Sequence, residues 1–156
     1  MSRFESIARD KTTVIDKILS SNEIMKALKY NELNFLEQPD FDNASLLYSS
    51  LFPHRFIPGT SDQKKTYITI SFGKYRPTKS SFKSGLITFS VFTHQDLFRT
   101  AYGCLRTDYI ITKLDEIFNE AEGLGVGKAE FYDMDALSMN PGYHGSYISY
   151  KVCDFN

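Results

Sequence analysis

Apolar side chains recur every three or four positions in two long stretches of the chain, which is the spacing of an amphipathic helix. The first stretch spans about residues 3–20 and the second about 106–122. A shorter stretch of the same kind, residues 22–29, predicts another helix. We expect the glycine-rich residues 123–127 to end the second long helix, because glycine readily adopts the left-handed conformation of a helix cap.

From residue 65 onward the apolar positions alternate with polar ones, which is typical of half-buried strands. Residues 67–72 and 86–93 predict two strands, and residues 128–135 and 146–155 predict two more. The first two strands are joined by residues 73–85. Because hairpin loops usually have roughly two to five residues, this segment is predicted to be a long hairpin loop.

The order of these elements predicts the fold class. Helices come first, followed by two strands, a long helix and two more strands, which favours an α+β domain. We expect a single two-layer domain over residues 1–156, with a mainly antiparallel four-stranded sheet and helices packed on one face. Such a sheet leaves edges and one face open, and these surfaces must be covered, charged or used to bind partners.

Composition narrows the class of protein. Hydrophobic residues make up 42% of the 156, and no apolar run approaches the roughly 20 residues of a membrane-spanning helix. The start of the chain has no apolar segment of a secretory signal, and two cysteines do not make a disulfide framework. These features predict a soluble intracellular domain without a membrane partner.

Charge is distributed unevenly along the chain, although the net charge is only −1. Residues 63–84 contain six Lys and Arg residues and no acid. The other 12 basic residues share the rest of the chain with all 19 acidic residues. The near-neutral net charge therefore conceals a basic segment within an otherwise acidic chain. Because the chain as a whole is not basic, the class of globally basic nucleic-acid-binding proteins is disfavoured.

No arrangement of residues indicates an active site. The glycines of residues 123–127 follow a helix and precede a strand, whereas a nucleotide-binding loop follows a strand and opens a helix. The histidines are far apart, and His94 ends a strand, where a histidine usually hydrogen-bonds the following turn. Asp133 and Asp135 share one strand face, but no third metal ligand is indicated. We expect no enzyme activity, no catalytic residue, no cofactor and no metal site.

The clearest candidate for a binding site is the basic segment between the first two strands. It mixes cations with aromatic side chains: Lys74, Tyr75, Arg76, Lys79, Phe82 and Lys83. This mixture suits a phosphate backbone with stacked bases, and it also suits an acidic protein surface. A mobile, solvated hairpin tip is the alternative without a function. Because the rest of the chain is net acidic and would repel DNA, we favour a protein partner and expect no specific nucleic-acid binding.

The segments and their order resemble the small α+β proteins of tailed-phage necks, and above all the tail terminator (tail completion) proteins. The resemblance runs from about residue 22 to the C-terminus. It begins with NEIMKALKYN and continues with LFPHRFIP, which leads into KTYITISFGKY. It ends with GLITFSVFTHQD, TDYIITKLDEIFN and GSYISYKVCDFN.

The resemblance implies a structural role without catalysis. Tail terminators form a ring, typically a hexamer, that stops growth of the tail tube and docks onto the head connector. It therefore implies self-association, with the tail-tube and head-connector proteins as partners. It also implies assembly in the host cytoplasm, a final location in the virion tail or neck, and passage of genome DNA through the ring. Two alternatives stay open: a head-completion or connector-ring protein of the same neck, and a small intracellular enzyme or regulator with a dispersed site.

Overall fold

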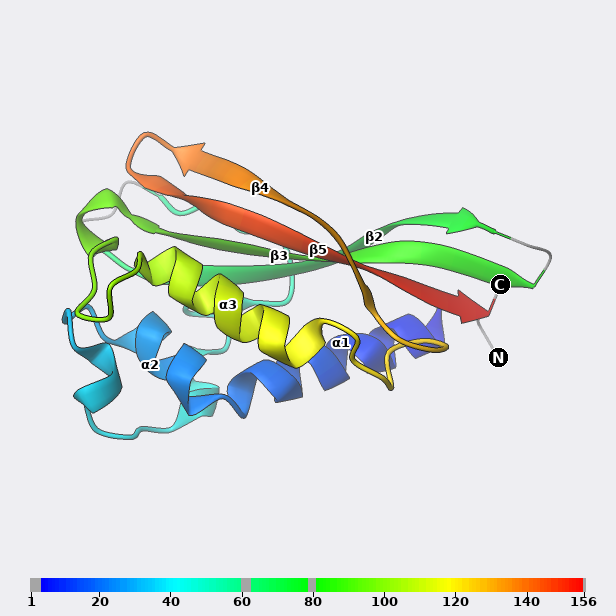
Figure 1. Ribbon diagram of the computed structural model, residues 1–156, viewed down its shortest axis with the longest axis horizontal. Helices are drawn as coiled ribbons and strands as arrows, with labels where there is room; N and C mark the ends of the chain where they lie inside the picture. Colours follow the sequence, from blue (N-terminus) through cyan, green and yellow to red (C-terminus); the bar gives the residue numbers. More distant parts are fainter. Residues whose placement is uncertain (1–3, 60–62, 79–80, 156) are drawn as a thin grey trace.

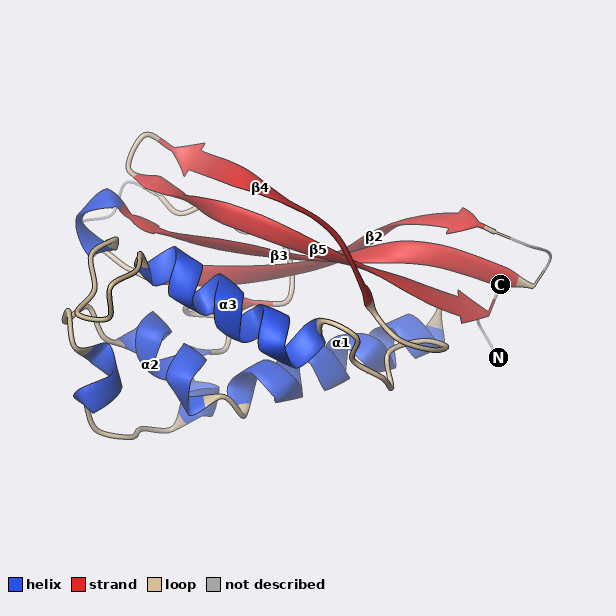
Figure 2. Cartoon of the chain, in the orientation of Figure 1, coloured by secondary structure: helices blue, strands red, loops and turns tan. Residues whose placement is uncertain are grey.

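The protein is built of two layers, a twisted sheet and a group of helices that all lie against one of its faces (Figures 1 and 2). The computed structural model describes residues 4–59, 63–78 and 81–155. The α-helices in this part of the chain are α1 (Glu5–Leu19), α2 (Asn22–Lys29) and α3 (Arg106–Phe118). The strands are β1 (Leu51–Phe52), β2 (Thr66–Pro77), β3 (Phe82–His94), β4 (Glu130–Asn140) and β5 (Tyr143–Phe155). Short 3₁₀-helices are η1 (Phe35–Glu37), η2 (Asn43–Leu46) and η3 (Gln95–Leu97). The predicted α+β class is confirmed.

The strands lie in the order β1-β2-β3-β5-β4. The four long strands pair antiparallel, as the sequence predicts, whereas β1 pairs in parallel with Ile68 and Thr69 of β2. The prediction of four strands missed β1, because two residues are too few to show alternation. Asn140 closes the turn between β4 and β5, since its Oδ1 accepts hydrogen bonds from the backbone N–H groups of Gly142 and Tyr143.

The hydrophobic core lies between the sheet and the helices. Phe89 of β3 stacks on Phe118 of α3 with ring centres 4.7 Å apart, and Leu114 is buried beside them. Val14 and Ile18 of α1 belong to the same buried cluster. No helix in the described part of the chain is long and apolar enough to cross a membrane.

A buried arginine joins α3 to the segment that follows α2. Arg106 is fully buried, and its guanidinium lies 4.9 Å from the centre of the Phe35 ring. It donates hydrogen bonds of 2.8–3.3 Å to the carbonyl oxygens of Ala27, Tyr30, Asn31, Glu32 and Leu97. One side chain therefore satisfies five backbone acceptors, two of which belong to the buried residues Ala27 and Leu97.

The prediction of a long hairpin loop over residues 73–85 is wrong. β2 continues to Pro77 and β3 begins at Phe82, so most of this segment is paired strand. We call residues 73–77 and 82–85 the arm of the sheet. The β2–β3 hairpin extends along the long axis of the molecule beyond the start of α1 (Figure 1).

The predicted end of the second long helix is also wrong. α3 ends at Phe118, and Glu120 has a φ of 62° in the left-handed region, three residues before the first glycine of residues 123–127. The backbone N–H of Glu120 then donates to the carbonyl oxygen of Ala129, which turns the chain toward β4. The N-terminal helix, expected over about residues 3–20, is confirmed as Glu5–Leu19.

Candidate interaction site on the arm

A β-bulge lies where the sequence predicted the start of a loop. The register of the β2–β3 ladder shifts between Gly73 and Arg76, so that Lys74 and Tyr75 lie opposite the single residue Gly85. Lys74 has a φ of 55°, in the left-handed region. The extra residue reverses the alternation of faces along β2. The period-two pattern therefore stops at the bulge although the strand continues.

Tyr75 turns toward the helices. Its ring lies over Gly85, where an added Cβ atom would be 2.4 Å from the ring, and its centre is 6.5 Å from that of the Phe4 ring. Burial, together with the carboxylates of Asp10 and Asp154, raises the pKa of Tyr75 to about 12. Glycine is needed at position 85 because an aromatic ring covers its backbone, and Tyr75 is part of the inner side of the arm.

Lys83 does not present its charge to solvent, so its assignment to an exposed interaction surface is wrong. The side chain is 4% exposed, its Nζ donates to the carbonyl oxygen of Phe155, and it lies 5.2 Å from the centre of the Phe4 ring. Phe82, the first residue of β3, stacks on Phe155 with ring centres 5.4 Å apart and stays 37% exposed. Of these two residues only Phe82 is accessible to a partner.

Lys74 and Arg76 are exposed on the face of the sheet that the helices leave open. With Tyr132 of β4 and Lys151 of β5 they line a depression of about 370 Å³. The sequence did not connect Lys151 with the basic segment, because only the sheet order brings β5 beside β3. Lys79, the remaining predicted site residue, lies outside the described residues. The structure thus gathers three cations on the open face of the arm.

A groove of about 400 Å³ continues along the same face. Small hydroxyl side chains line it, and Thr88 and Ser149 share a hydrogen bond of 2.8 Å. Phe56, from the segment after β1, stacks on Phe52 at 4.1 Å between ring centres and covers the end of the face that is far from the arm. The open face therefore changes from apolar and covered to polar and then basic toward the arm.

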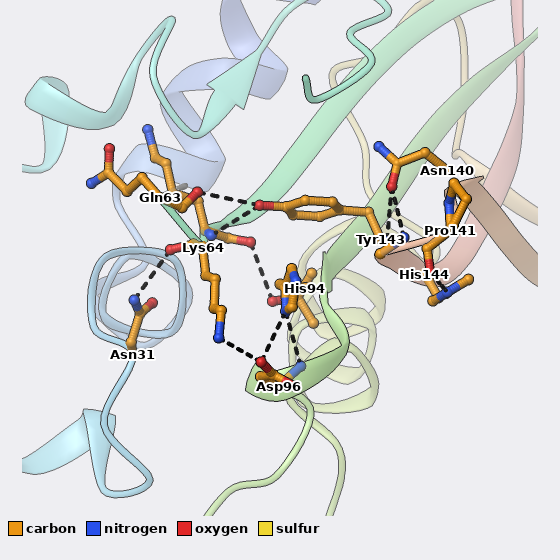
Figure 3. Close-up of polar contacts among 12 residues, drawn as sticks. Asn31, Gln63, Lys64, His94, Asp96, Asn140, Pro141, Tyr143 and His144 are labelled. Atoms are coloured by element: carbon orange, nitrogen blue, oxygen red, sulfur yellow. Dashed lines mark hydrogen bonds and ion pairs between the residues drawn. The ribbon is translucent and has the colours of Figure 1, made fainter. Parts of the chain in front are cut away.

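A polar network occupies the end of the sheet opposite the arm (Figure 3). Nζ of Lys64 lies 2.5 Å from Oδ2 of Asp96, and this hydrogen bond lowers the pKa of the Asp96 carboxyl. The backbone N–H of Asp96 donates to Nδ1 of His94 at 3.1 Å, so His94 hydrogen-bonds the following turn, as predicted. The hydroxyl of Tyr143 donates to the carbonyl oxygen of Gln63 at 3.4 Å. These contacts link the residues before β2 to the turn after β3 and to the start of β5.

The turn at residues 123–127 uses its own backbone donors within the chain. The N–H of Gly125 donates to Oδ2 of Asp10 at 3.1 Å, and the N–H of Val126 donates to the carbonyl oxygen of Cys153 at 2.7 Å. A Cβ atom at Gly125 would be 2.1 Å from that carbonyl oxygen. The carboxylate of Asp10 therefore already accepts the hydrogen bond from Gly125 that a bound phosphate would need.

Asp133 and Asp135 lie on one face of β4, as the sequence predicts, because they pair with Ser149 and Tyr147 of β5. The hydroxyl of Tyr147 donates to Oδ2 of Asp133 at 3.2 Å. In the part of the chain that the structure describes, no three His, Cys, Asp or Glu side chains are grouped so that they could hold a metal ion. The carboxylates instead give β4 an acidic surface.

The family model of YomW matches residues 21–152, which span α2 to most of β5 and leave out α1. No curated protein and no solved structure matches the chain. The chain therefore belongs to the YomW family, which is phage-derived. This membership agrees with the resemblance to phage proteins at the level of a phage origin.

Proposed function

We propose that this member of the YomW family is a structural protein of a phage neck, which caps the tail tube as a ring and joins it to the head connector. The proposal rests on the two unpaired edges of the sheet. β4 forms one edge along its whole length, and in the described chain no strand pairs with the outer edge of β2 beyond Thr69. A ring of identical subunits covers both edges of every copy at once.

The polar side chains support a structural role. The strongest upward pKa shifts belong to tyrosine hydroxyls on the inner side of the fold, and two of these donate to carboxylates: Tyr109 to Glu23 at 2.8 Å and Tyr150 to Asp115 at 2.6 Å. Among the described residues no buried side-chain nitrogen or oxygen lacks a hydrogen-bond partner. Active sites usually keep titratable groups with shifted pKa values in a cleft. Here the tyrosine hydroxyls instead form hydrogen bonds that link α3 to α2 and to β5.

The proposal is tested with a phage from which the gene has been deleted. Electron micrographs of the lysate should show tails of irregular length that are not joined to heads, and the wild-type gene supplied in trans should restore infectious particles. Labelling of the protein in complete particles should mark the junction of head and tail.

The same micrographs separate the alternatives. A head-completion or connector-ring protein would leave tails of uniform length beside unjoined heads that have lost their DNA. Normal particles that lack the protein would reject every neck role and favour the enzyme or regulator.

A further inference from the structure

The two free edges of the sheet run in directions that suit each other. β2 pairs antiparallel with β3, β3 with β5, and β5 with β4. Three reversals make β4 run opposite to β2. A second copy placed beside the first in the same orientation therefore brings its β2 antiparallel to the β4 of the first, so the sheet can continue from copy to copy with ordinary ladder hydrogen bonds.

The register shows how far the two free edges overlap along the sheet. Phe72 of β2 pairs with Ile87, Ile87 pairs with Tyr150, and Tyr150 pairs with Phe131 of β4. Of the unpaired half of β2, only residues 70–73 are therefore level with β4, and Lys74 and Arg76 lie beyond its first residue. A second copy displaced along the strands by about five residues brings residues 74–77 beside β4, which is a stagger of the kind that closed sheets require. Large apolar side chains are exposed on the first half of β4: Phe131, Tyr132 and Met134.

An apolar groove runs beside this half of β4. It has a volume of about 440 Å³ and lies between α3 and the edge strand, with Ile111, Phe131, Met134 and Ile148 in its lining. A long edge strand with exposed aromatic side chains is a site of association between chains unless something covers it. On the free edge of β2, Phe72 is only partly buried.

The charges on the two edge strands favour a contact of β4 with β2 over a contact of β4 with a second β4. β4 carries Glu130, Asp133 and Asp135 and no basic residue, whereas β2 carries Lys74 and Arg76 and no acid. By register, the side chains of Lys74, Arg76, Asp133 and Asp135 lie on the open face of the sheet. A symmetric contact of β4 with β4 would place acids against acids, whereas a contact of β4 with β2 places acids against bases.

We propose that copies of this chain assemble head to tail, with β4 of one copy paired antiparallel to the outer edge of β2 in the next. With the neighbour displaced in this way, Asp133 faces Arg76 and Asp135 faces Lys74 of the neighbour, and Tyr132 and Met134 of β4 lie at the junction. This inference rests on the proposed function, because it names the contact through which the ring closes.

Paired charge reversals test the contact in purified protein by sedimentation at low salt. Asp133→Lys with Asp135→Lys should weaken self-association by about tenfold or more, because like charges then meet. Lys74→Glu with Arg76→Glu should do the same, and the chain that carries all four changes should associate again. Asp16→Lys with Glu116→Lys, two exposed acids on helices, is the control with the same change in charge. Circular dichroism and thermal unfolding establish that each variant is folded.

The inference is overturned if the wild-type protein stays monomeric in this assay. It is also overturned if either reversal leaves association unchanged or strengthens it, or if the fourfold variant does not recover. Because the arm and β4 variants alter different strands, the failure of one to fold leaves the other as the test. Complementation of the deletion phage separates the two proposals. If both reversals still complement and associate normally, the strand pairing fails and the neck function stands, whereas normal particles without the gene reject the neck function itself.

Discussion

Single side chains hold together parts of this fold that the hydrophobic pattern does not connect. Arg106 begins α3, a position where a charged residue is normally solvated, so nothing in the hydrophobic pattern singles it out. Its role depends on five carbonyl groups from two distant segments. This role can be recognised only from the tertiary structure, in which the loop after α2 and the end of η3 come together around the arginine.

Replacement of this arginine should be among the most damaging single changes. Arg106→Ala is expected to lower the free energy of unfolding by about 3 kcal/mol or more, because five carbonyl groups lose their donors, including those of the buried residues Ala27 and Leu97. Arg106→Lys keeps the charge but supplies fewer donors without the planar fork, so it should recover only part of the loss. Urea denaturation measures both. An Arg106→Ala protein within about 1 kcal/mol of wild type would contradict this account.

Asp10 should give stability a measurable pH dependence. Burial, and then the nearby Asp154, raise the pKa of Asp10 above its ordinary value of 3.8. A carboxyl with a raised pKa in the folded protein stabilises the fold while protonated, and this contribution is lost as the pH rises through the folded-state pKa. Asp10→Asn should therefore remove part of the fall in stability from about pH 4 upward. Thermal unfolding across this range measures it, with the exposed Asp16→Asn as control.

Asp10→Asn should be at least as stable as wild type at neutral pH, since its amide oxygen can still accept the hydrogen bond from Gly125. A clear loss of stability at neutral pH would mean that the charge on that acceptor outweighs the cost of burying it.

At the scale of elements, prediction succeeded wherever one hydrophobic period ran without interruption. Both long helices and the four long strands were predictable for this reason. The arm was not, because the bulge at Lys74 reverses the faces of β2 and the glycines on either side resemble loop boundaries. The same error affected the candidate site, since Lys83 and Tyr75 were assigned to solvent and turn inward, while Lys151 was missed.

The two glycines of the arm should respond differently to a methyl group. Gly85→Ala is expected to cost about 1–3 kcal/mol, because its Cβ would be 2.4 Å from the Tyr75 ring and must displace it. Gly73→Ala meets no atom within 4 Å and should be neutral or slightly stabilising. Thermal unfolding compares them, and adding Tyr75→Ala to Gly85→Ala should remove the conflict. Equal effects of the two alanines would show that the ring does not constrain position 85.

At the scale of the whole molecule, α1 is the element that supports the arm. It lies outside the residues that match the family, yet it contacts both the end of β5 and the turn at residues 123–127. Ser6 donates to Asp154 at 2.5 Å, and Asp10 accepts from Gly125 at 3.1 Å. The hydrophobic pattern predicted that α1 exists. It could not predict where α1 docks, because the docking depends on polar contacts with residues more than a hundred positions away.

A substitution that weakens the docking of α1 should therefore increase local opening of the arm more than local opening of the rest of the sheet. Ile18→Ala is expected to cost about 2–5 kcal/mol, because Ile18 is fully buried. Partial undocking of α1 would uncover the inner side of the arm, so amide hydrogens of residues 82–85 should exchange faster relative to those near His94. Ile110→Ala, an equally buried change in α3, is the control and should destabilise the fold without this preference. If Ile18→Ala accelerates exchange equally along the whole of β3, then α1 stabilises the molecule only globally, and the arm does not depend on it in particular.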